Sequence, residues 1–375
     1  MSRRNPDGPL ESRAPFDRAA TPLAVRNHVL VLPSVICSHA VADRIAEAVE
    51  GCVATPHDHG CAQIGRDNDR TERTLVAMGA HPNVAGCVVV GLGCEHVQSS
   101  AVAAALEGTV PVRELSIQGV GGTDACLERG REYAAELRAA ADGREPAAEP
   151  SLGELTVGVV STDLTEATLE TAEPLVGAFV ERVLDAGGRV VLAGTERLAA
   201  HPESAREWTA SADGGSLDLE TVLERERSGP PRAPRIRHRA DGLTPDGLAT
   251  LWGSAPIDEL LEYGTQPAPA SRLAFVDTAS RFEEATTGLV AAGCHLVVHV
   301  TGDGIPTGHP LAPVVKVCAT PETLAAVSDD IDVDARTATA DDLTARVLAV
   351  ASGTPSRAEV HGVTSFAIER AGPSL

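Results

Sequence analysis

Imidazole, thiol and carboxylate side chains are concentrated in two stretches of the chain, residues 57–65 and 91–96. Each stretch follows a short apolar run of the kind that forms a strand. His57 and His59 are two positions apart, so in an extended loop their rings point the same way and can bind one cation or a substrate carboxylate. The alternative interpretation of this pair is a surface loop with incidental histidines.

The candidate metal ligands in the two stretches are His57, His59, Cys61 and Cys94. Imidazole and thiolate together suit zinc or ferrous iron. Glu95 is interpreted as a site carboxylate, with an acidic residue favoured by the dipole at a helix start as the alternative. Gly91 and Gly93 match the start of a dinucleotide-binding fingerprint, but His96 occupies the position of the third glycine, so this signal is weak.

The second half of the chain contains a further glycine-rich loop with Thr301, Gly302 and Gly304. Such a loop can expose backbone N–H groups that bind an anion, and no lysine follows at the Walker position, so nucleotide hydrolysis is not expected. Lys316 is the only lysine among 31 basic residues and lies in an apolar run. Its compact ammonium and tunable pKa make it a catalytic candidate, and an ordinary lysine of an edge strand is the alternative.

Eight cysteines are scattered along the chain without the spacing of a disulfide framework. Cys52, Cys87 and Cys126 lie in apolar patterns and are predicted to be core residues. Cys37, Cys61 and Cys94 differ from them, because each comes just after a predicted strand.

Two parallel sheets would position these residues. Apolar runs alternate with helical patterns in both halves of the chain, which indicates βαβ crossovers. The predicted fold is α/β, with two Rossmann-like, doubly wound parallel-sheet domains at residues 25–145 and 152–351. Loops that leave the carboxyl ends of parallel strands gather along one edge, so Cys37, His59, Cys94 and Gln118 are expected to share an edge.

The predicted strands are residues 28–32, 52–55, 84–91, 110–117, 155–160, 189–193, 273–276, 295–300 and 314–317. The predicted helices are residues 39–49, 69–80, 98–106, 124–141, 168–186, 282–292, 321–327 and 341–351.

Four segments lie outside these patterns. Residues 1–24 predict an extended arm, residues 142–153 a linker, and the Arg- and Pro-rich residues 225–242 a surface excursion or flexible loop. The polar residues 352–375 are expected to form a loosely held tail.

The composition excludes several classes of protein. The 375 residues carry a formal charge of −22 and the isoelectric point is about 4.9, which argues against binding to nucleic acid or an anionic membrane. No apolar run is long enough to span a membrane, and the first residues lack the apolar core of a signal peptide, so a cytoplasmic protein is expected. An acidic surface almost without lysine is typical of proteins from salt-loving cells, and coding bias is the alternative.

Several motifs together resemble the altronate/galactarate dehydratase family, which also includes the large subunit of sulfolactate sulfo-lyase. The motifs are residues 25–33, Cys37, residues 57–65, 81–86 and 91–95, Gln118 with Gly121, Gly122 and Thr123, and then residues 291–293, 301–306, 313–317 and 330–332.

This resemblance implies a metal-dependent hydro-lyase that acts on a sugar acid or related hydroxycarboxylate, with iron, manganese or zinc as the divalent metal. It implies His59 as base or ligand, Glu95 as acid or ligand, and Lys316 or the Gly302 loop as the anchor of the substrate carboxylate. The substrate-binding residues that it implies are Gln118, Gly121, Gly122, Thr123, Thr301, Gly302 and Gly304.

The sequence departs from the family pattern in two places. At the start of the second domain, residues 159–163 replace a Glu-Cys-Gly-Gly-Ser-Asp run, and residues 225–254 share little with the family. The small amino-terminal module of the single-chain dehydratases is not found, so a separate small subunit is expected to supply it, and a homo-oligomer is also expected. The alternatives are an inactive paralogue that serves as a binding or regulatory subunit, and a nucleotide-binding protein that uses the Gly302 loop.

Overall fold

The computed structural model describes residues 23–142, 149–210, 212, 215–229, 231–253 and 255–372. Most of the predicted arm and the centre of the predicted linker lie outside these residues. No helix within the described ranges is both long and apolar enough to cross a membrane.

In the described part of the first half, four parallel strands form a sheet in the order β2, β1, β3, β4. Val29 and Val31 pack against α1 and α4 on one face, whereas Leu30 and Leu32 pack with residues of α2 and α3 on the other, because side chains alternate along a strand. The elements are β1 (His28–Pro33), α1 (Ile36–Ala46), β2 (Cys52–Ala54), α2 (Arg66–Gly79), β3 (Val84–Gly91), α3 (Ser99–Leu106), β4 (Val112–Ser116) and α4 (Thr123–Ala141).

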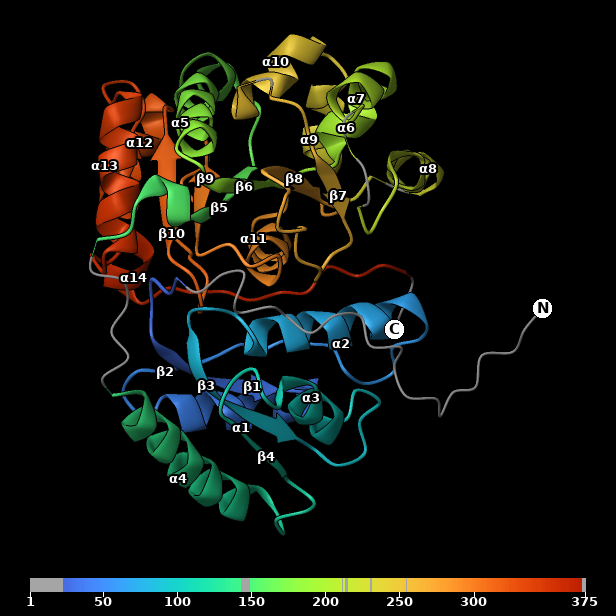
Figure 1. The fold of residues 1–375 in the computed structure, drawn as a ribbon, viewed down its shortest axis with the longest axis vertical. Coiled ribbons are helices and arrows are strands. Elements are labelled where there is room, and N and C mark those ends of the chain that lie inside the picture. The colour runs from blue at the N-terminus through green and yellow to red at the C-terminus, as the bar shows by residue number, and fades with distance from the viewer. Residues whose placement is uncertain are drawn as a thin grey trace, which may run out of the picture.

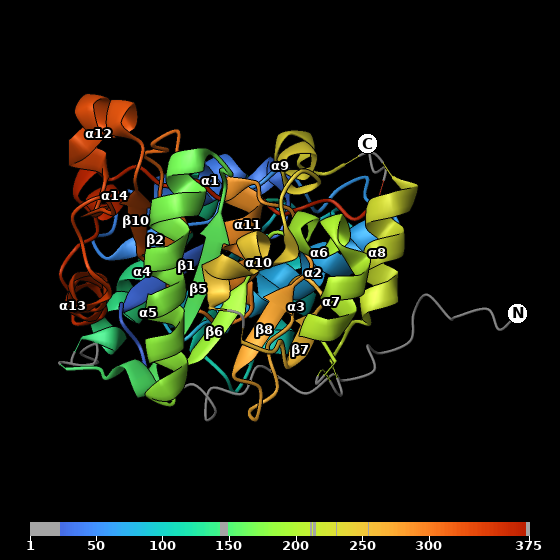
Figure 2. The same ribbon diagram turned by 90° about the horizontal axis from the view of Figure 1, so that it is seen from above.

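In the described part of the second half, seven parallel strands form a sheet in the order β11, β10, β9, β5, β6, β8, β7. Figure 2 shows part of this succession from above. Helices α5 and α13 pack on one face of the sheet, and α11 covers the other. The elements are β5 (Thr156–Ser161), α5 (Glu173–Asp185), β6 (Arg189–Leu192), β7 (Glu259–Leu261), β8 (Leu273–Val276), α11 (Phe282–Ala291), β9 (Leu296–Val300), β10 (Val314–Cys318), α12 (Pro321–Val327), β11 (Val333–Asp334), α13 (Ala340–Ala351) and α14 (Arg357–His361). The predicted fold class is therefore confirmed.

The described residues between β6 and β7 form five short helices: α6 (Glu196–Ala200), α7 (Pro202–Trp208), α8 (Leu219–Ser228), α9 (Pro234–Ala240) and α10 (Pro245–Ala249). The prediction of a surface excursion or flexible loop at residues 225–242 is wrong for the described part. Ile236 and Ala240 of α9 are buried against Leu164 and Leu248. Arg232 pairs with the buried carboxylates of Glu226 and Asp277, so its charge is compensated inside the protein.

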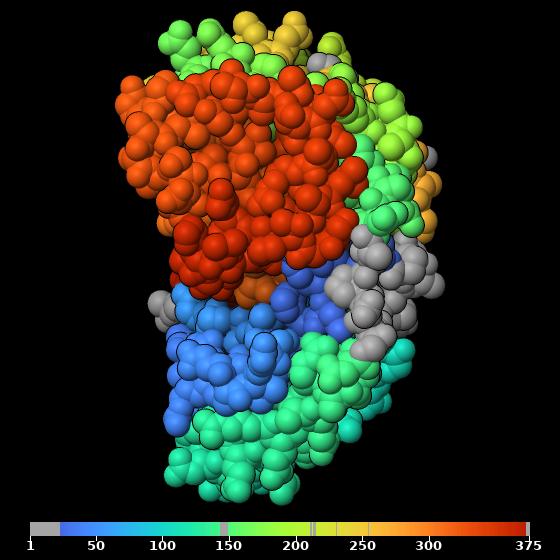
Figure 3. Space-filling view, turned by 90° about the vertical axis from the view of Figure 1, so that its left-hand side faces the viewer, coloured from blue at the N-terminus to red at the C-terminus, as the bar shows by residue number. Residues whose placement is uncertain are grey.

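The two halves share one apolar core. Helix α2 of the first half packs on α11 of the second, and both lie between the two sheets (Figure 1). The buried Asn83 side chain adds polar contacts: it accepts from the Val25 amide at 3.0 Å and donates to the carbonyls of His295 at 3.1 Å and Leu311 at 2.9 Å. From the side, the first half and the end of the second half lie in direct contact (Figure 3).

The expectation of a loosely held tail is wrong. After α14, the chain runs between the two halves (Figure 1), and Phe366, Ile368 and Glu369 are buried there. Thr364 pairs with Gly308, and the Phe366 ring lies 6.3 Å from the His57 ring and 5.7 Å from the His309 ring. Alternating apolar side chains at 366 and 368 are too short a pattern to reveal this burial from sequence.

Replacement of Phe366 by alanine tests the packing of this segment. Loss of the buried ring should lower the free energy of unfolding by about 3 kcal/mol. Thermal unfolding followed by circular dichroism measures the change. The control is Val363→Ala, because Val363 is 39% exposed and its loss should have little effect. Equal melting temperatures for the two variants would show that the segment does not stabilise the fold.

Candidate functional site

Three loops meet at the carboxyl edge of the first sheet, after β1, β2 and β3. The Ile36 amide donates to the His59 carbonyl at 2.8 Å, and the His96 amide donates to the Gly60 carbonyl at 3.2 Å. Gly60 has a φ of +89°, and a Cβ there would lie 2.2 Å from the Ser34 carbonyl oxygen. Only glycine therefore allows the second loop to approach the first this closely.

The two histidines of this edge are buried and hydrogen-bonded at both ring nitrogens. His59 Nδ1 lies 2.6 Å from the Gln63 amide nitrogen, and its Nε2 lies 2.9 Å from the Ile368 carbonyl oxygen. Gln63 Oε1 accepts from the Gly60 main-chain amide and the Thr71 hydroxyl, so the side-chain nitrogen of Gln63 is the group that faces His59. This nitrogen donates to His59 Nδ1. The ring proton of His59 is therefore on Nε2, which donates it to the Ile368 carbonyl. His57 accepts from the His59 amide at 3.1 Å and donates to the Pro33 carbonyl at 2.8 Å.

Both imidazoles are held neutral by this environment. Burial lowers the pKa of His57 to about 4. Burial also lowers the pKa of His59, although the neighbouring Asp58 carboxylate opposes this effect. As arranged, neither ring has a free nitrogen, so the imidazole half of the predicted ligand set does not fit a metal ion. Across the described ranges, no group of three or more His, Cys, Asp or Glu side chains is placed to hold one metal ion.

Glu95 lies at the same edge and is 3% exposed. Its carboxylate accepts from the Ser34 hydroxyl at 3.0 Å and from the Gly93 amide at 2.5 Å. Burial by itself would raise the pKa of Glu95, but these hydrogen bonds outweigh it and hold the pKa below the ordinary value. An ionised carboxylate suits a base or a ligand better than an acid.

The remaining candidates of the first half follow β4, on the neighbouring strand. The main-chain amide of Gln118 donates to the Leu92 carbonyl at 2.9 Å, and the Gln118 side chain lies beside Gly93. Gly121 and Gly122 both have positive φ and lead into α4 at Thr123. The structure thus brings the predicted residues of the first half together at one edge of the sheet.

The cysteines divide as the sequence predicted. Cys87 and Cys126 are buried and Cys52 is half-buried, and burial raises the pKa of each thiol. In contrast, Cys37, Cys61 and Cys94 are exposed. Cys37 lies in the first turn of α1 and not in the preceding loop, because the helix begins at Ile36.

The glycine-rich loop of the second half is closed by its own side chains. The Thr301 hydroxyl accepts from the amides of Gly304 at 3.0 Å and Ile305 at 3.3 Å, so these two N–H groups do not face an anion. Gly302 lies against Asp163, since a Cβ at Gly302 would be 2.0 Å from a carboxylate oxygen of that residue. This arrangement gives no support to a nucleotide site.

Lys316 lies in β10 beside His299 of β9 and has no exposed surface. Its ammonium donates to the Pro306 carbonyl of the glycine-rich loop. Burial lowers the pKa of Lys316 to about 8, against the opposing effect of Asp332 and Asp330. The lysine therefore holds this loop, and a substrate can reach it only if the loop moves.

The C-terminal segment connects the two edges. Ile368 accepts from His59 of the first half, and the next residue, Glu369, accepts from the Ala279 amide of the second half at 3.1 Å. Arg70 of α2 and Arg232 contact the same Glu369 carboxylate. The C-terminal segment, which the sequence predicted to lie outside both domains, thus links the predicted residue His59 to the loop after β8 in the second half.

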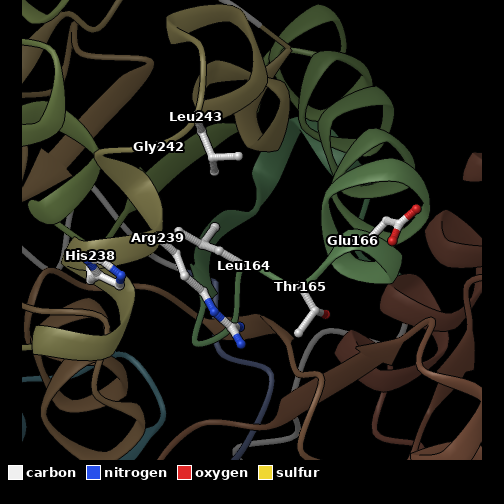
Figure 4. A pocket seen from close by; sticks show the side chains of 7 residues that line it. All are labelled: Leu164, Thr165, Glu166, His238, Arg239, Gly242 and Leu243. Atoms are coloured by element: carbon white, nitrogen blue, oxygen red, sulfur yellow. The ribbon is translucent and has the colours of Figure 1, made fainter.

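A surface depression of about 560 Å³ lies near the carboxyl end of β5 and was not predicted (Figure 4). Beside it, the buried Asp163 carboxylate accepts from Arg239 at 2.7 Å and from Thr165 at 2.6 Å. The surface depression is lined by Leu164, Thr165, Glu166, His238, Arg239, Gly242 and Leu243. Three of these come from the Arg- and Pro-rich segment, where Pro234 in the first turn of α9 was the available signal of a helix.

Two family models match the chain. Residues 15–142 match the second domain of D-galactarate dehydratase/altronate hydrolase, and residues 246–374 match the C-terminal domain of D-galactarate/altronate dehydratase. The first match includes the whole edge that carries the histidines and the exposed cysteines.

Three known proteins are similar to this chain along most of its length. The beta subunit of (2R)-sulfolactate sulfo-lyase from Chromohalobacter salexigens is 28% identical, over 93% of this chain and 94% of that protein. The altronate dehydratase of Bacillus subtilis is 25% identical, over 88% of this chain and 69% of that protein. The altronate dehydratase of Escherichia coli is 28% identical, over 85% of this chain and 68% of that protein.

The hydrogen bonds of Glu95 predict a loss of stability on replacement by glutamine. Glu95→Gln should lower the free energy of unfolding at neutral pH by about 2 kcal/mol, because hydrogen bonds to a charged acceptor are lost. Since the pKa of Glu95 is lowered by folding, this stabilisation is present above the unfolded pKa of about 4.5 and disappears as the pH falls through the folded value. Urea unfolding at several pH values measures it, with the exposed Glu107→Gln as control. A difference that does not shrink in acid would contradict the assignment.

The buried ammonium of Lys316 predicts a pH dependence of the same sign, but in the alkaline range. Folding lowers its pKa from 10.5 to about 8, so the unfolded state binds more protons between these values. The free energy of unfolding of the wild type should therefore rise relative to that of Lys316→Met as the pH increases through this window. Parallel urea titrations of both proteins measure the difference, and a constant difference across the window would refute the buried position.

Proposed function

Because the chain belongs to the D-galactarate dehydratase/altronate hydrolase family, we propose that it is a carbon–oxygen lyase that removes water from a hydroxylated carboxylate. The substrate class is a sugar acid or a related hydroxycarboxylate; with sulfolactate, the group that leaves in the elimination would be sulfite in place of water. The observation that carries the proposal is the edge of the first sheet, where the family match coincides with Glu95, His59, Gln118 and three exposed thiols, two on adjoining loops and one in the first turn of α1.

Elimination of water needs a base for the proton next to the carboxylate and an acid for the departing hydroxyl. His59 is proposed as the base, which requires the Gln63 amide to leave Nδ1 when substrate binds. The imidazolium that forms is proposed to pass its proton to the departing hydroxyl, which then leaves as water. Lys316, whose pKa is near 8, is proposed as the cationic anchor of the substrate carboxylate after the Pro306 carbonyl moves away. Glu95 is proposed to act as an ionised carboxylate that orients this edge.

The chain is also proposed to be the large subunit of a two-chain enzyme. The similarity to a protein described as subunit beta extends over 94% of that protein. Ile36, the first residue of α1 and next to Cys37, is 37% exposed, and Ile64, on the loop that carries Cys61, is 72% exposed. A small subunit that covers this edge would bury both side chains and exclude water from the reaction.

Four other properties belong to the proposal as predictions from the sequence: dependence on iron, manganese or zinc, a homo-oligomer, a cytoplasmic location and adaptation to concentrated salt. The exposed thiols support metal dependence, because thiolates are ligands for these metals. The imidazole rings do not support it as they are arranged, so no step of the reaction is derived through a metal.

The second candidate function is a binding or regulatory subunit without turnover. It is favoured by one observation: His59, Glu95 and Lys316 are all buried and engaged in internal hydrogen bonds. A protein that only binds a carboxylate needs fewer accessible groups than a lyase.

An activity screen separates the two candidates. The purified chain is incubated with aldonates, aldarates and sulfolactate, with and without a candidate small subunit and each of the three metals, and the keto acid or sulfite product is measured. We expect product from at least one substrate and a kcat for His59→Ala that is lower by ~100-fold or more.

The control for this variant is His361→Ala, because His361 is exposed on α14. It should retain the wild-type rate. Binding of a carboxylate without product under every condition would favour the regulatory subunit.

A further inference from the structure

The depression near the carboxyl end of β5 lies where the connections of the second sheet change direction. In the described part of that sheet, β5 is next to β9, and the chain continues from β5 to β6 on one side and from β9 to β10 on the other. Loops that leave two such strands diverge, and the crevice beyond their carboxyl ends is where ligands bind in open parallel sheets. The position of the depression therefore favours a ligand site.

Two arginines converge on one buried carboxylate at this crevice. Asp163 is 1% exposed; it accepts from Arg239 at 2.7 Å, and the Arg235 guanidinium lies 4.0 Å away. Thr165 and Thr168 donate to the second oxygen of Asp163 at 2.6 Å and 3.0 Å. Both oxygens of this carboxylate have partners within the protein, so Asp163 holds Arg239 in place and does not face a ligand.

Arg239 keeps most of its capacity to donate hydrogen bonds. A guanidinium has five N–H donors in a planar fork, and in the described ranges Asp163 is the one hydrogen-bond partner of the Arg239 side chain. The Arg239 side chain is 38% exposed and lines the depression, where Figure 4 shows it extending toward Thr165. It therefore has donors left for a carboxylate or phosphate group, which a guanidinium can bind through two parallel N–H bonds.

The charge around Arg239 contrasts with that of the whole chain. The formal net charge is −22, but α9 has no acidic residue and four basic ones, which are Arg235, Arg237, His238 and Arg239. Arg237 pairs with Asp241 at 2.8 Å and does not line the depression. Glu166 is the acidic residue of the lining, and Figure 4 shows its carboxylate directed away from Arg239. An anion that most of the chain repels thus meets a cation here.

Leucine side chains form the apolar part of the lining. Leu164 is buried with Ile236 of α9, and the half-buried Leu243 packs against the same cluster. This packing fixes α9, and with it Arg239, beside the end of β5. A volume of about 560 Å³ is in the range of small-molecule sites. The lining therefore suits a small molecule with one anionic group and an uncharged remainder.

The residues of the depression lie outside both family matches. Those matches cover residues 15–142 and 246–374, whereas Asp163, α9 and the lining residues lie between them. They are also not the residues on which the proposed function depends. A ligand of this depression is therefore not implied by the family or by the proposed reaction.

We propose that the depression binds a small organic anion, with the Arg239 guanidinium holding its carboxylate or phosphate group and the leucine side chains facing its uncharged remainder. His238, which also lines the depression, offers a further ring N–H donor. The inference goes beyond the proposed function, and it holds whether or not the chain turns over a substrate.

Isothermal titration of the full chain tests the site. The probes share one carbon skeleton: D-glycerate carries a carboxylate, glycerol 3-phosphate carries a phosphate, and glycerol carries no charge. Each probe is titrated at one ionic strength set with sodium chloride, so that screening is the same throughout. We expect saturable binding of at least one of the two anions and none of glycerol. The anion that binds more tightly shows whether the site selects a carboxylate or a phosphate.

Substitutions locate the binding. Arg239→Gln should raise the dissociation constant of that anion by about tenfold or more, because charge-assisted hydrogen bonds are lost. The matched control is Arg237→Gln, which removes the same charge from the same helix outside the depression and should keep the wild-type value. Glu166→Gln removes the acidic residue of the lining and should lower the dissociation constant by about twofold.

A further variant guards against loss of folding. Arg239→Gln leaves the buried Asp163 carboxylate without its closest arginine, so circular dichroism is recorded for every variant. Arg239→Lys keeps a cation beside Asp163 but loses the planar fork, and it should also weaken binding. Together with Glu166→Gln, which changes an exposed side chain, this variant tests the site even if Arg239→Gln does not fold.

Three results would overturn the inference: no saturable binding of either anion, equal binding of glycerol, or equal dissociation constants for Arg239→Gln and Arg237→Gln. Anion binding that depends on Arg239, without lyase activity on any substrate, would support the site and count against the proposed function. Lyase activity without such binding would overturn the site and leave the proposed function intact.

Discussion

The carboxylate of Glu369 is the contact on which the arrangement of the two halves depends. It is buried, it accepts from the Ala279 amide after β8, and it lies between Arg70 of the first half and Arg232 of the second. A buried charge is stable only when it is paired and hydrogen-bonded, and here the partners come from three distant parts of the chain. The two sheets and the C-terminal segment are therefore fixed relative to one another.

This constraint also determines the state of the candidate site. Because Glu369 is held, the preceding Ile368 carbonyl is placed to accept from His59, and that contact together with Gln63 uses both nitrogens of the ring. Lys316 is covered in a similar way by the Pro306 carbonyl. If His59 and Lys316 have the roles proposed for them, substrate binding must move the groups that cover them, which belong to the C-terminal segment and the glycine-rich loop.

The exposed thiols stand apart from the covered catalytic candidates. They lie on loops whose main chains are hydrogen-bonded to one another, so their arrangement does not require the same movement. The depression near Asp163 and Arg239 is a separate feature of the second half, on the side where this sequence departs from its family.

The sequence by itself determined the elements and the first edge. Apolar periodicity located β3 and β8 at their observed bounds, and the rule that parallel strands gather their following loops at one edge placed Cys37, His59, Cys94 and Gln118 together. The tertiary structure alone decided which groups are free to act. The partners of His59, Lys316 and Glu369 come from residues up to hundreds of positions away, and local patterns carry no information about such contacts. For the same reason, the Arg-rich segment looked like a solvated loop, although Arg232 and Arg239 are held by the buried carboxylates of Asp277 and Asp163.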